Sequence, residues 1–257
     1  MENSHLPVDY FQISREGVTK DQLNAAVESP VTLSVNGESW LTFQCTPTEI
    51  ESLALGFLYN EGFITSLHEV ENTHLCADNT TIDIWLDHQV NKPVTWHRST
   101  GCYNGLSTNV DDRNQLDYIF PTLTMQTKNI FELIDLFMSH QMPRKLSGGI
   151  HTSALADGIS IVLQLIDIGR HNTFDKIAGR MLLDEIRINS PVLITTGRIS
   201  SELVYKSAIM RSQILISMRS ASQSAIVLAD QLGITLISSA NRFRYNVLSH
   251  PERVLQV

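Results

Sequence analysis

Hydrophobic and polar positions alternate along residues 31–35 and again along residues 40–43, and Asn36-Gly37 lies between these two segments. A period of two is typical of half-buried strands, and Asn-Gly is the strongest signal for a two-residue hairpin turn. We therefore predict a β-hairpin in this region. Two further apolar segments predict additional strands, at residues 81–86 and 93–96.

A helix is predicted directly after the hairpin. Thr46 can cap its first turn, Pro47 suits its first position, and Glu49 completes a capping box. Apolar residues between positions 50 and 58 then recur with the helical period, and Gly62 is placed to end the helix. The first 100 or so residues thus read as an α+β unit that is rich in hairpins.

The pattern changes in the second half of the chain, after an amphipathic helix predicted around residues 130–137. Asp157-Gly158 joins two predicted strands, 150–156 and 159–165. Beyond them, predicted helices at 174–182, 203–210 and 222–232 alternate with predicted strands at 192–194, 214–216 and 234–237. Such alternation predicts an α/β fold with a partly parallel sheet and right-handed crossovers. We divide the chain into an N-terminal α+β subdomain, 1–126, and a C-terminal α/β subdomain, 127–257.

Composition and charge narrow the class of protein. The chain has 257 residues, of which 42% are hydrophobic, enough for one large domain or two small ones, and we expect disorder only in the first dozen or so residues. The net charge of −8 argues against general nucleic-acid binding, which needs clustered Lys and Arg. No apolar stretch is long enough to cross a bilayer, and the N-terminus does not resemble a signal peptide. We therefore expect a soluble, cytoplasmic protein without membrane insertion.

The three cysteines are widely separated and form neither a disulfide framework nor a zinc-ribbon spacing. Cys45 and Cys76 read as packing residues. Cys102 lies between Gly101 and Gly105 in a stretch that predicts neither helix nor strand. A turn of this kind gives a thiol access and nearby backbone N–H groups, and both favour reactivity. The alternative interpretation is an incidental or buried cysteine.

Three successive predicted strands end in an arginine beside small residues and a helix start. The segments are Asp167 to Asn172 with Arg170, Thr195 to Ser200 with Arg198, and Ser217 to Ser222 with Arg219. We expect Asn172 and Ser200 to cap the helices that follow, with Asp175 in the first turn of the first one. Helix N-termini attract anions and arginine binds phosphate through two donors, so these ends predict a site for a polyphosphate or another multiply anionic ligand. The alternative is that each arginine bridges locally on the surface.

The remaining candidates are two histidines and a C-terminal segment. His151 follows Gly148-Gly149, and His171 lies in one of the arginine loops; neither forms a metal-ligand spacing with Cys102, so no metal site is expected. In the segment from Ser239 onward two arginines alternate with two aromatics, which suits stacking on a nucleobase or a pterin-like ring. The alternative there is an ordinary edge strand with outward arginines. The candidate ring-contacting residues are Ser239, Ala240, Asn241, Arg242, Phe243 and Arg244.

These segments together resemble the formate dehydrogenase accessory protein family, FdhD/NarQ. The N-terminal likeness lies in Val35-Asn36-Gly37-Glu38, in Thr46-Pro47, in Leu53 to Leu58 and in Glu61-Gly62. The central likeness lies in Gly148 to His151, in Asp167 to Asn172 and in Asp175-Lys176. Further matching residues follow in the C-terminal part of the chain: Gly197-Arg198, Ser200, Glu202, Lys206 and Arg219-Ser220-Ala221. The segment Gly169-Arg170-His171-Asn172 with Asp175-Lys176 is the most specific part.

The resemblance implies a cytidine-deaminase-like three-layer α/β core in the C-terminal half, without the zinc site of the deaminases. It implies a sulfur carrier that accepts persulfide sulfur from a cysteine desulfurase and passes it to the molybdenum cofactor, bis-molybdopterin guanine dinucleotide, for formate dehydrogenase. It also implies a homodimer. Under this resemblance Cys102 matches the persulfide cysteine, and the Ser239–Arg244 segment contacts the cofactor. The cofactor is also expected to be bound by two histidines and three strand-end arginines, namely His151, His171, Arg170, Arg198 and Arg219. GDP is expected to mimic the nucleotide end of the cofactor.

The chain departs from the family pattern at the cysteine loop. The family usually has C-x-x-C there, and in this chain Gly105 occupies the second cysteine position. A second thiol helps to release sulfur by thiol–disulfide exchange, and this loop has none. The alternative function is therefore a cofactor-binding chaperone for formate dehydrogenase that does not transfer sulfur.

Overall fold

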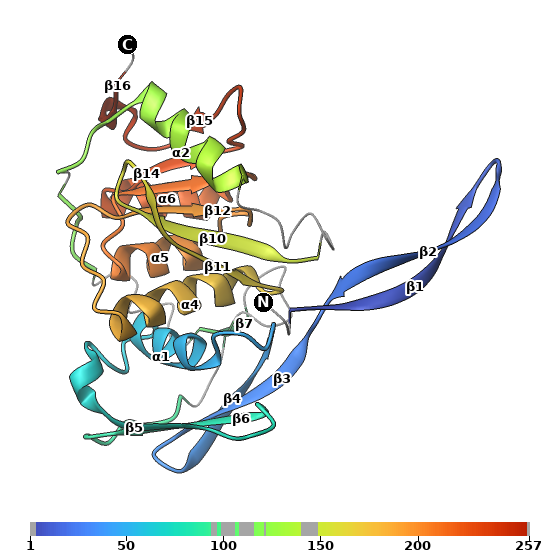
Figure 1. Ribbon diagram of the computed structural model, residues 1–257. Coiled ribbons are helices and arrows are strands. Elements are labelled where there is room, and N and C mark those ends of the chain that lie inside the picture. The colour runs from blue at the N-terminus through green and yellow to red at the C-terminus, as the bar shows by residue number, and fades with distance from the viewer. Residues whose placement is uncertain are drawn as a thin grey trace.

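The computed structural model describes residues 4–93, 97–98, 106–107, 116–120, 122–139 and 149–255. The chain begins with a long hairpin formed by β1 (His5–Ser14) and β2 (Gly17–Ala26), which projects away from the body of the molecule (Figure 1). The strands pair in unbroken register from His5 opposite Ala26 to Ser14 opposite Gly17. The expectation of disorder in the first dozen residues is therefore wrong from His5 onward, because cross-strand backbone hydrogen bonds order a segment whose side chains stay largely exposed.

A four-stranded sheet follows, in the order β4-β3-β6-β5. Its strands are β3 (Ser29–Val35), β4 (Glu38–Cys45), β5 (Val70–Leu75) and β6 (Thr81–Leu86). The predicted hairpin and the strand at 81–86 are confirmed, and Asn36 and Gly37 both adopt positive φ, as a type I′ turn requires. The predicted strand at 93–96 lies almost wholly outside the described residues. Just beyond it the short strands β7 (His97–Arg98) and β8 (Leu106–Ser107) pair with each other.

The helix α1 (Ile50–Asn60) packs on this sheet, and the 3-10 turn η1 (Leu67–Glu69) follows it. The capping box predicted for α1 is wrong. Glu49 occupies the N-cap position in a left-handed conformation and makes no side-chain cap bond. The Thr46 hydroxyl instead accepts a hydrogen bond from the Ile168 amide at 3.1 Å. The side chain that was expected to cap α1 therefore bonds to a residue far away in the sequence.

The C-terminal half contains a six-stranded sheet in the order β11-β10-β12-β13-β14-β15. Its strands are β10 (His151–Ala156), β11 (Ile161–Asp167), β12 (Val192–Thr195), β13 (Ile214–Ser217), β14 (Thr235–Ser238) and β15 (Asn246–Val247). The three central strands β12, β13 and β14 are parallel, and the outer strands run antiparallel to their neighbours. The predicted hairpin at Asp157-Gly158 and the partly parallel sheet are both confirmed.

Helices cover both faces of this sheet (Figure 1). Helices α4 (Arg170–Leu183), α5 (Ser201–Ile209) and α6 (Gln223–Leu232) share one apolar core with it, and α2 (Thr127–Ser139) shares the other. Beside α2, β9 (Met125–Gln126) pairs in parallel with β16 (Val254–Leu255), which follows the 3-10 turn η3 (Pro251–Arg253). The mixed α/β class is thus confirmed, and the likeness to cytidine deaminases stays a prediction.

The two sheets are joined through α1 and α4, which lie against each other. The contact is close because each helix presents a glycine: a Cβ on Gly56 would overlap the Asp175 carbonyl oxygen, and a Cβ on Gly179 would overlap the Ser52 carbonyl oxygen. The division of the chain at residue 126 stays a prediction; Ile119 and Met125, just before it, pack in the cores of the C-terminal half. Among the described residues, no helix is both long and apolar enough to span a membrane.

Candidate anion-binding site

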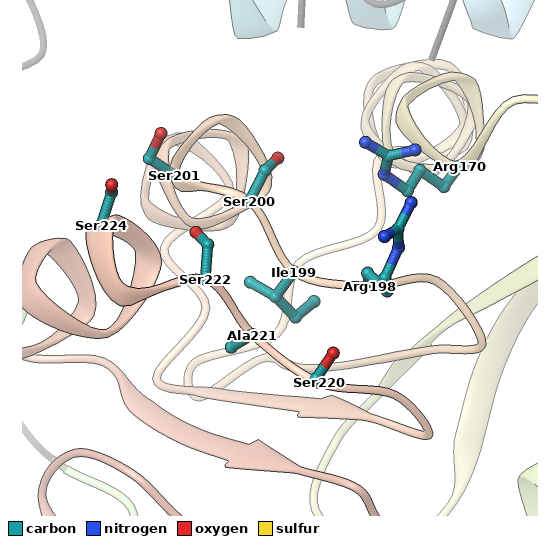
Figure 2. A pocket seen from close by; sticks show the side chains of 9 residues that line it. All are labelled: Arg170, Arg198, Ile199, Ser200, Ser201, Ser220, Ala221, Ser222 and Ser224. Atoms are coloured by element: carbon teal, nitrogen blue, oxygen red, sulfur yellow. The ribbon is translucent and has the colours of Figure 1, made fainter. Parts of the chain in front are cut away.

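A cavity of about 440 Å³ opens where the loops after β12 and β13 meet the start of α4. Figure 2 shows two guanidinium groups on one side of it and a group of serine hydroxyls on the other. The lining residues are Arg170, Arg198, Ile199, Ser200, Ser201, Ser220, Ala221, Ser222 and Ser224. The charged groups in this lining are both cationic, and the other polar groups are small hydroxyls. Such a composition suits an anion with several oxygen atoms.

The two loops that form the cavity floor are held together by backbone hydrogen bonds. The Ile199 amide donates to the Ser220 carbonyl at 3.1 Å, and the Ser222 amide donates to the Ile199 carbonyl at 3.0 Å. The Ser217 hydroxyl donates to the Gly197 carbonyl at 2.6 Å beneath them. The parallel pairing of the sheet thus continues past the strand ends, which fixes the positions of the helix starts that follow.

Helices α5 and α6 both begin at this cavity. Ser200 is the N-cap residue of α5, as predicted, but its side chain makes no cap bond. Ser222 is the N-cap residue of α6, and its hydroxyl accepts a hydrogen bond from the Ala225 amide at 3.2 Å. The first N–H groups of a helix lack partners within the helix and carry a partial positive charge, so two helix starts here add to the attraction for an anion.

Arg170 and Arg198 are the two strand-end arginines that the structure brings together in the cavity. Arg170 is the first residue of α4 and is only 5% exposed, whereas Arg198 is exposed on the loop after β12. Gly197 makes room for the stem of Arg170, because a Cβ at this glycine would lie 3.0 Å from the Arg170 Cβ. Arg170 is therefore a largely buried residue of the cavity lining and not an exposed surface side chain.

Two details predicted for α4 are wrong. Gly169 is its N-cap residue, and Asn172 lies inside the first turn, where its Nδ2 donates to Asp167 at 2.9 Å and to the Gln44 carbonyl at 2.9 Å. Asp175 lies beyond the first turn and accepts two hydrogen bonds of 2.6 Å from Lys206. The helix begins earlier than the capping pattern indicates, because both side chains are used for contacts between elements.

Neither predicted histidine lines the cavity. His171 is buried, with Nε2 3.1 Å from Glu202 Oε2 and 3.2 Å from Oγ of the lining residue Ser200. Burial lowers the pKa of His171, and the adjacent Glu202 carboxylate opposes that effect. His151 is half-buried at the start of β10, with Nδ1 3.4 Å from the hydroxyl oxygen of Thr196. His171 thus adjoins the cavity through Ser200, and His151 contacts the loop that leads to it.

Arg219 and the predicted ring-contacting segment lie next to this cavity but do not line it. The Ser239 amide donates to the Arg219 carbonyl and the Ala240 amide donates to the Ser217 carbonyl, so the segment runs beside the end of β13. Its side chains diverge from there. Arg242 Nε lies 3.3 Å from Asp135 of α2, and Phe243 is 90% exposed.

Arg244 lines a second cavity, of about 650 Å³, with Lys128, Phe131 and Tyr245. Asn241 accepts hydrogen bonds from the amides of Phe243 and Arg244 and so forms a turn. The edge strand that was the alternative interpretation begins only at Asn246. Three of the five arginine candidates therefore line two separate cavities, with Arg170 and Arg198 in one and Arg244 in the other, whereas Arg219 and Arg242 line neither.

Sequence reasoning missed Ser201 and Ser224 as lining residues. The signal for them is the density of serine at the two helix starts, Ser200-Ser201 and Ser220 to Ser224. Cys102 and Gly105 lie outside the described residues. Within the described part of the chain, no group of three or more His, Cys, Asp or Glu side chains is placed to hold a metal ion.

Comparisons with known proteins converge on one family. The model of the FdhD/NarQ family matches residues 26–255. Two curated relatives from Staphylococcus aureus, of strains bovine RF122 / ET3-1 and JH9, are named sulfur carrier protein FdhD; each is 29% identical over 97% of this chain and 95% of its own length. The crystal structure assigned to a formate dehydrogenase accessory protein from Desulfotalea psychrophila superposes with a TM-score of 0.84 at 23% identity, over 98% of this chain and all of that one. The family match begins where the projecting hairpin ends.

Proposed function

The chain belongs to the FdhD/NarQ family, and from this premise we propose that it is a sulfur carrier that serves the maturation of formate dehydrogenase. In the proposed reaction the Cys102 thiolate attacks the outer sulfur of a persulfide on a cysteine desulfurase. A Cys102 persulfide forms, and the desulfurase cysteine leaves as a thiolate, so the step needs no external oxidant. The chain then acts as a sulfurtransferase: the outer sulfur of the Cys102 persulfide passes to the molybdenum cofactor, which supplies the two electrons that reduce it to sulfide, and Cys102 is released as a thiolate.

The observation that carries the proposal is the cavity of Arg170 and Arg198 at the starts of α5 and α6. The cofactor that we propose as bound substrate, bis-molybdopterin guanine dinucleotide, carries diphosphate groups. Two guanidinium groups, two helix starts and a set of serine hydroxyls match such a group in charge and in hydrogen-bond donors. The proposal places a diphosphate there and the ring-contacting role in the Ser239–Arg244 segment. GDP is the simplest probe, because it contains the same guanosine diphosphate group.

The resemblance adds three further expectations to this proposal. The protein acts in the cytoplasm, it forms a homodimer, and its C-terminal half is related to cytidine deaminases. Its proposed macromolecular partners are a cysteine desulfurase, which supplies sulfur, and formate dehydrogenase, which receives the finished cofactor.

The first experiment measures sulfur transfer directly. The purified chain is incubated with a cysteine desulfurase and cysteine, and its peptides are analysed by mass spectrometry. The peptide with Cys102 should gain the mass of one sulfur atom. Cys102→Ala should abolish this gain and the activation of formate dehydrogenase. Cys76→Ala is the matched control, because it removes another thiol of the chain, one that is half-buried, and it should leave both intact. Full activation of formate dehydrogenase by Cys102→Ala would refute the role of carrier.

The second candidate function, a cofactor chaperone without sulfur transfer, is favoured by one observation: Gly105 replaces the usual second cysteine. The chaperone binds the cofactor but gains no sulfur. Calorimetry with GDP separates the two functions when it is combined with the sulfur measurement. In both cases Arg198→Gln should weaken GDP binding about tenfold or more, because it removes a charged hydrogen-bond donor. Binding of GDP without a mass gain on Cys102 would establish the chaperone.

A further inference from the structure

Between α4 and α5, the hydrogen bonds of His171 determine what the hydroxyl group of Ser200 can do. His171 is the second residue of α4, and its side chain is 5% exposed. Two oxygen atoms from the start of α5 lie close to the same ring atom: Ser200 Oγ forms a hydrogen bond with it, and Glu202 Oε2 forms an ion-pair contact without hydrogen-bond geometry. Glu202 Oε2 is 3.1 Å from Nε2, and Ser200 Oγ is 3.2 Å from it.

The chemistry of Glu202 settles where the proton of the ring lies. An ionised carboxylate oxygen attracts a ring N–H and repels a ring lone pair, so Glu202 Oε2, 3.1 Å from Nε2, favours the form of the ring with hydrogen on Nε2. This holds for the neutral ring, in the tautomer with hydrogen on Nε2, and equally for the cationic ring. A protonated Nε2 has no lone pair to offer. Ser200 Oγ can therefore only accept from His171, and the hydrogen of its own hydroxyl group is left for donation elsewhere.

Ser200 lines the cavity that contains Arg170 and Arg198, so an oxygen atom of a bound anion is the natural acceptor for this hydrogen (Figure 2). We propose that His171 is a positioning residue: held by Glu202, it makes Ser200 a committed hydrogen-bond donor to the phosphate oxygen of a nucleoside diphosphate. The inference rests on the proposed function for its ligand. It reassigns His171 from direct contact with the cofactor to action through Ser200.

The test is a double-mutant cycle on GDP binding, measured by calorimetry with the full chain. Ser200→Ala removes the donor and should weaken binding about tenfold. His171→Leu leaves the hydroxyl group without its fixed orientation and should weaken binding by a similar factor. The double variant His171→Leu/Ser200→Ala should bind no more weakly than Ser200→Ala alone, because one residue acts through the other. His171→Gln places an amide N–H near the position of Nε2 and should keep the affinity within about threefold of the wild type.

A merely structural role for His171 predicts different results. The losses from His171→Leu and Ser200→Ala would then multiply, and His171→Gln would not restore binding; either result overturns the proposal. Melting temperatures of all variants show whether His171→Leu disturbs the fold, and the Gln variant keeps the test decisive if it does.

Nitrogen NMR of the unliganded protein provides a reading that needs no ligand. The ¹⁵N shifts of His171 should show hydrogen on Nε2. A neutral ring with hydrogen on Nδ1 alone would overturn the positioning role even if GDP binds. Failure of the wild-type chain to bind GDP or pyrophosphate would instead refute the proposed cofactor site, so the two failures are distinguishable.

Discussion

At the scale of single residues, burial decides that Cys45 cannot serve as the sulfur-carrying thiol. Its side chain is fully buried, and burial, with the nearby charge of Asp167, raises its pKa to about 12. The thiolate is the reactive form, and it is almost absent at neutral pH when the pKa is this high. Cys76 lies half-buried at the turn between β5 and β6, where its thiol donates to Asp78 at 2.8 Å.

We therefore predict that iodoacetamide at pH 8 labels Cys76 in the native protein and leaves Cys45 unlabelled. Peptide mapping by mass spectrometry measures both sites in one sample. In denaturant both cysteines should react, which controls for peptide detection. Labelling of Cys45 at the rate of Cys76 under native conditions would contradict its burial.

At the scale of elements, the contact between α1 and α4 depends on two glycines. A methyl group on Gly56 or Gly179 would overlap backbone atoms of the opposite helix, and a helix backbone cannot move aside as a flexible side chain can. The two helices would have to separate. Because they also join the two apolar cores, the separation would expose residues on both sides of the contact.

We expect Gly56→Ala and Gly179→Ala each to lower the free energy of unfolding by about 3 kcal/mol or more, the upper end of the range for overpacking. Urea denaturation measures this loss. Gly62→Ala is the matched control, since a Cβ there meets open space and adds only the cost of a positive φ, about 1 kcal/mol. Equal losses at all three positions would show that close helix packing is not the cause.

At the scale of the whole molecule, the buried cation Lys206 of α5 forms ion pairs with α4 and with the end of α1, and so links the two halves of the chain. Lys206 of α5 lies 2.6 Å from Asp175 of α4 and 3.8 Å from Glu61 at the end of α1. Asn60 also donates to Asp175, at 2.8 Å. Burial alone lowers the pKa of Lys206, but the charges of Asp175 and Glu61 outweigh it, and the net shift is upward.

A raised pKa in the folded state makes this contribution to stability pH-dependent in one direction. The stabilisation from the Lys206 ion pair is fully present below the pKa of lysine in the unfolded chain, about 10.4. It is lost as the pH rises through the higher pKa that Lys206 has in the folded protein. We expect Lys206→Met to lower the free energy of unfolding by about 3–5 kcal/mol at neutral pH, because it leaves Asp175 buried without its cation.

Urea denaturation at pH 8 and at pH 11 measures this effect, and the loss of stability at alkaline pH should be smaller in Lys206→Met than in the wild type. Lys128→Met is the control, since Lys128 is exposed and its pair with Glu132 is worth less than about 0.5 kcal/mol. A neutral-pH loss as small as that of the control would show that Lys206 does not link the two halves.

Local signals in the sequence were sufficient for much of the fold and for part of the site. Asn36-Gly37 and Asp157-Gly158 predicted their hairpins because such turns depend on the backbone freedom of two adjacent residues. The strand-end arginines predicted an anion site because parallel strands bring their carboxyl ends to one edge, and Arg170 and Arg198 do meet there. The projecting hairpin was missed because its side chains show no buried face, and its order comes from backbone pairing.

The sequence by itself determined the α/β class and the places of most strands and helices, since these follow from local periodicity and turn chemistry, and it predicted that strand-end arginines and helix starts lie at one edge of the sheet. Only the tertiary structure decided that Arg170 and Arg198, but not Arg219, line the same cavity. Only the tertiary structure decided what Thr46, Asn172, Asp175 and His171 do. Thr46 and Asn172 read locally as caps and Asp175 as a first-turn charge, and each instead bonds to a partner on another element. His171 reads as a ligand-binding group, and the fold places it against Ser200 and Glu202 of the next helix. The physical reason is that a buried polar group must be satisfied by whatever packing places beside it, and packing is set by the whole chain.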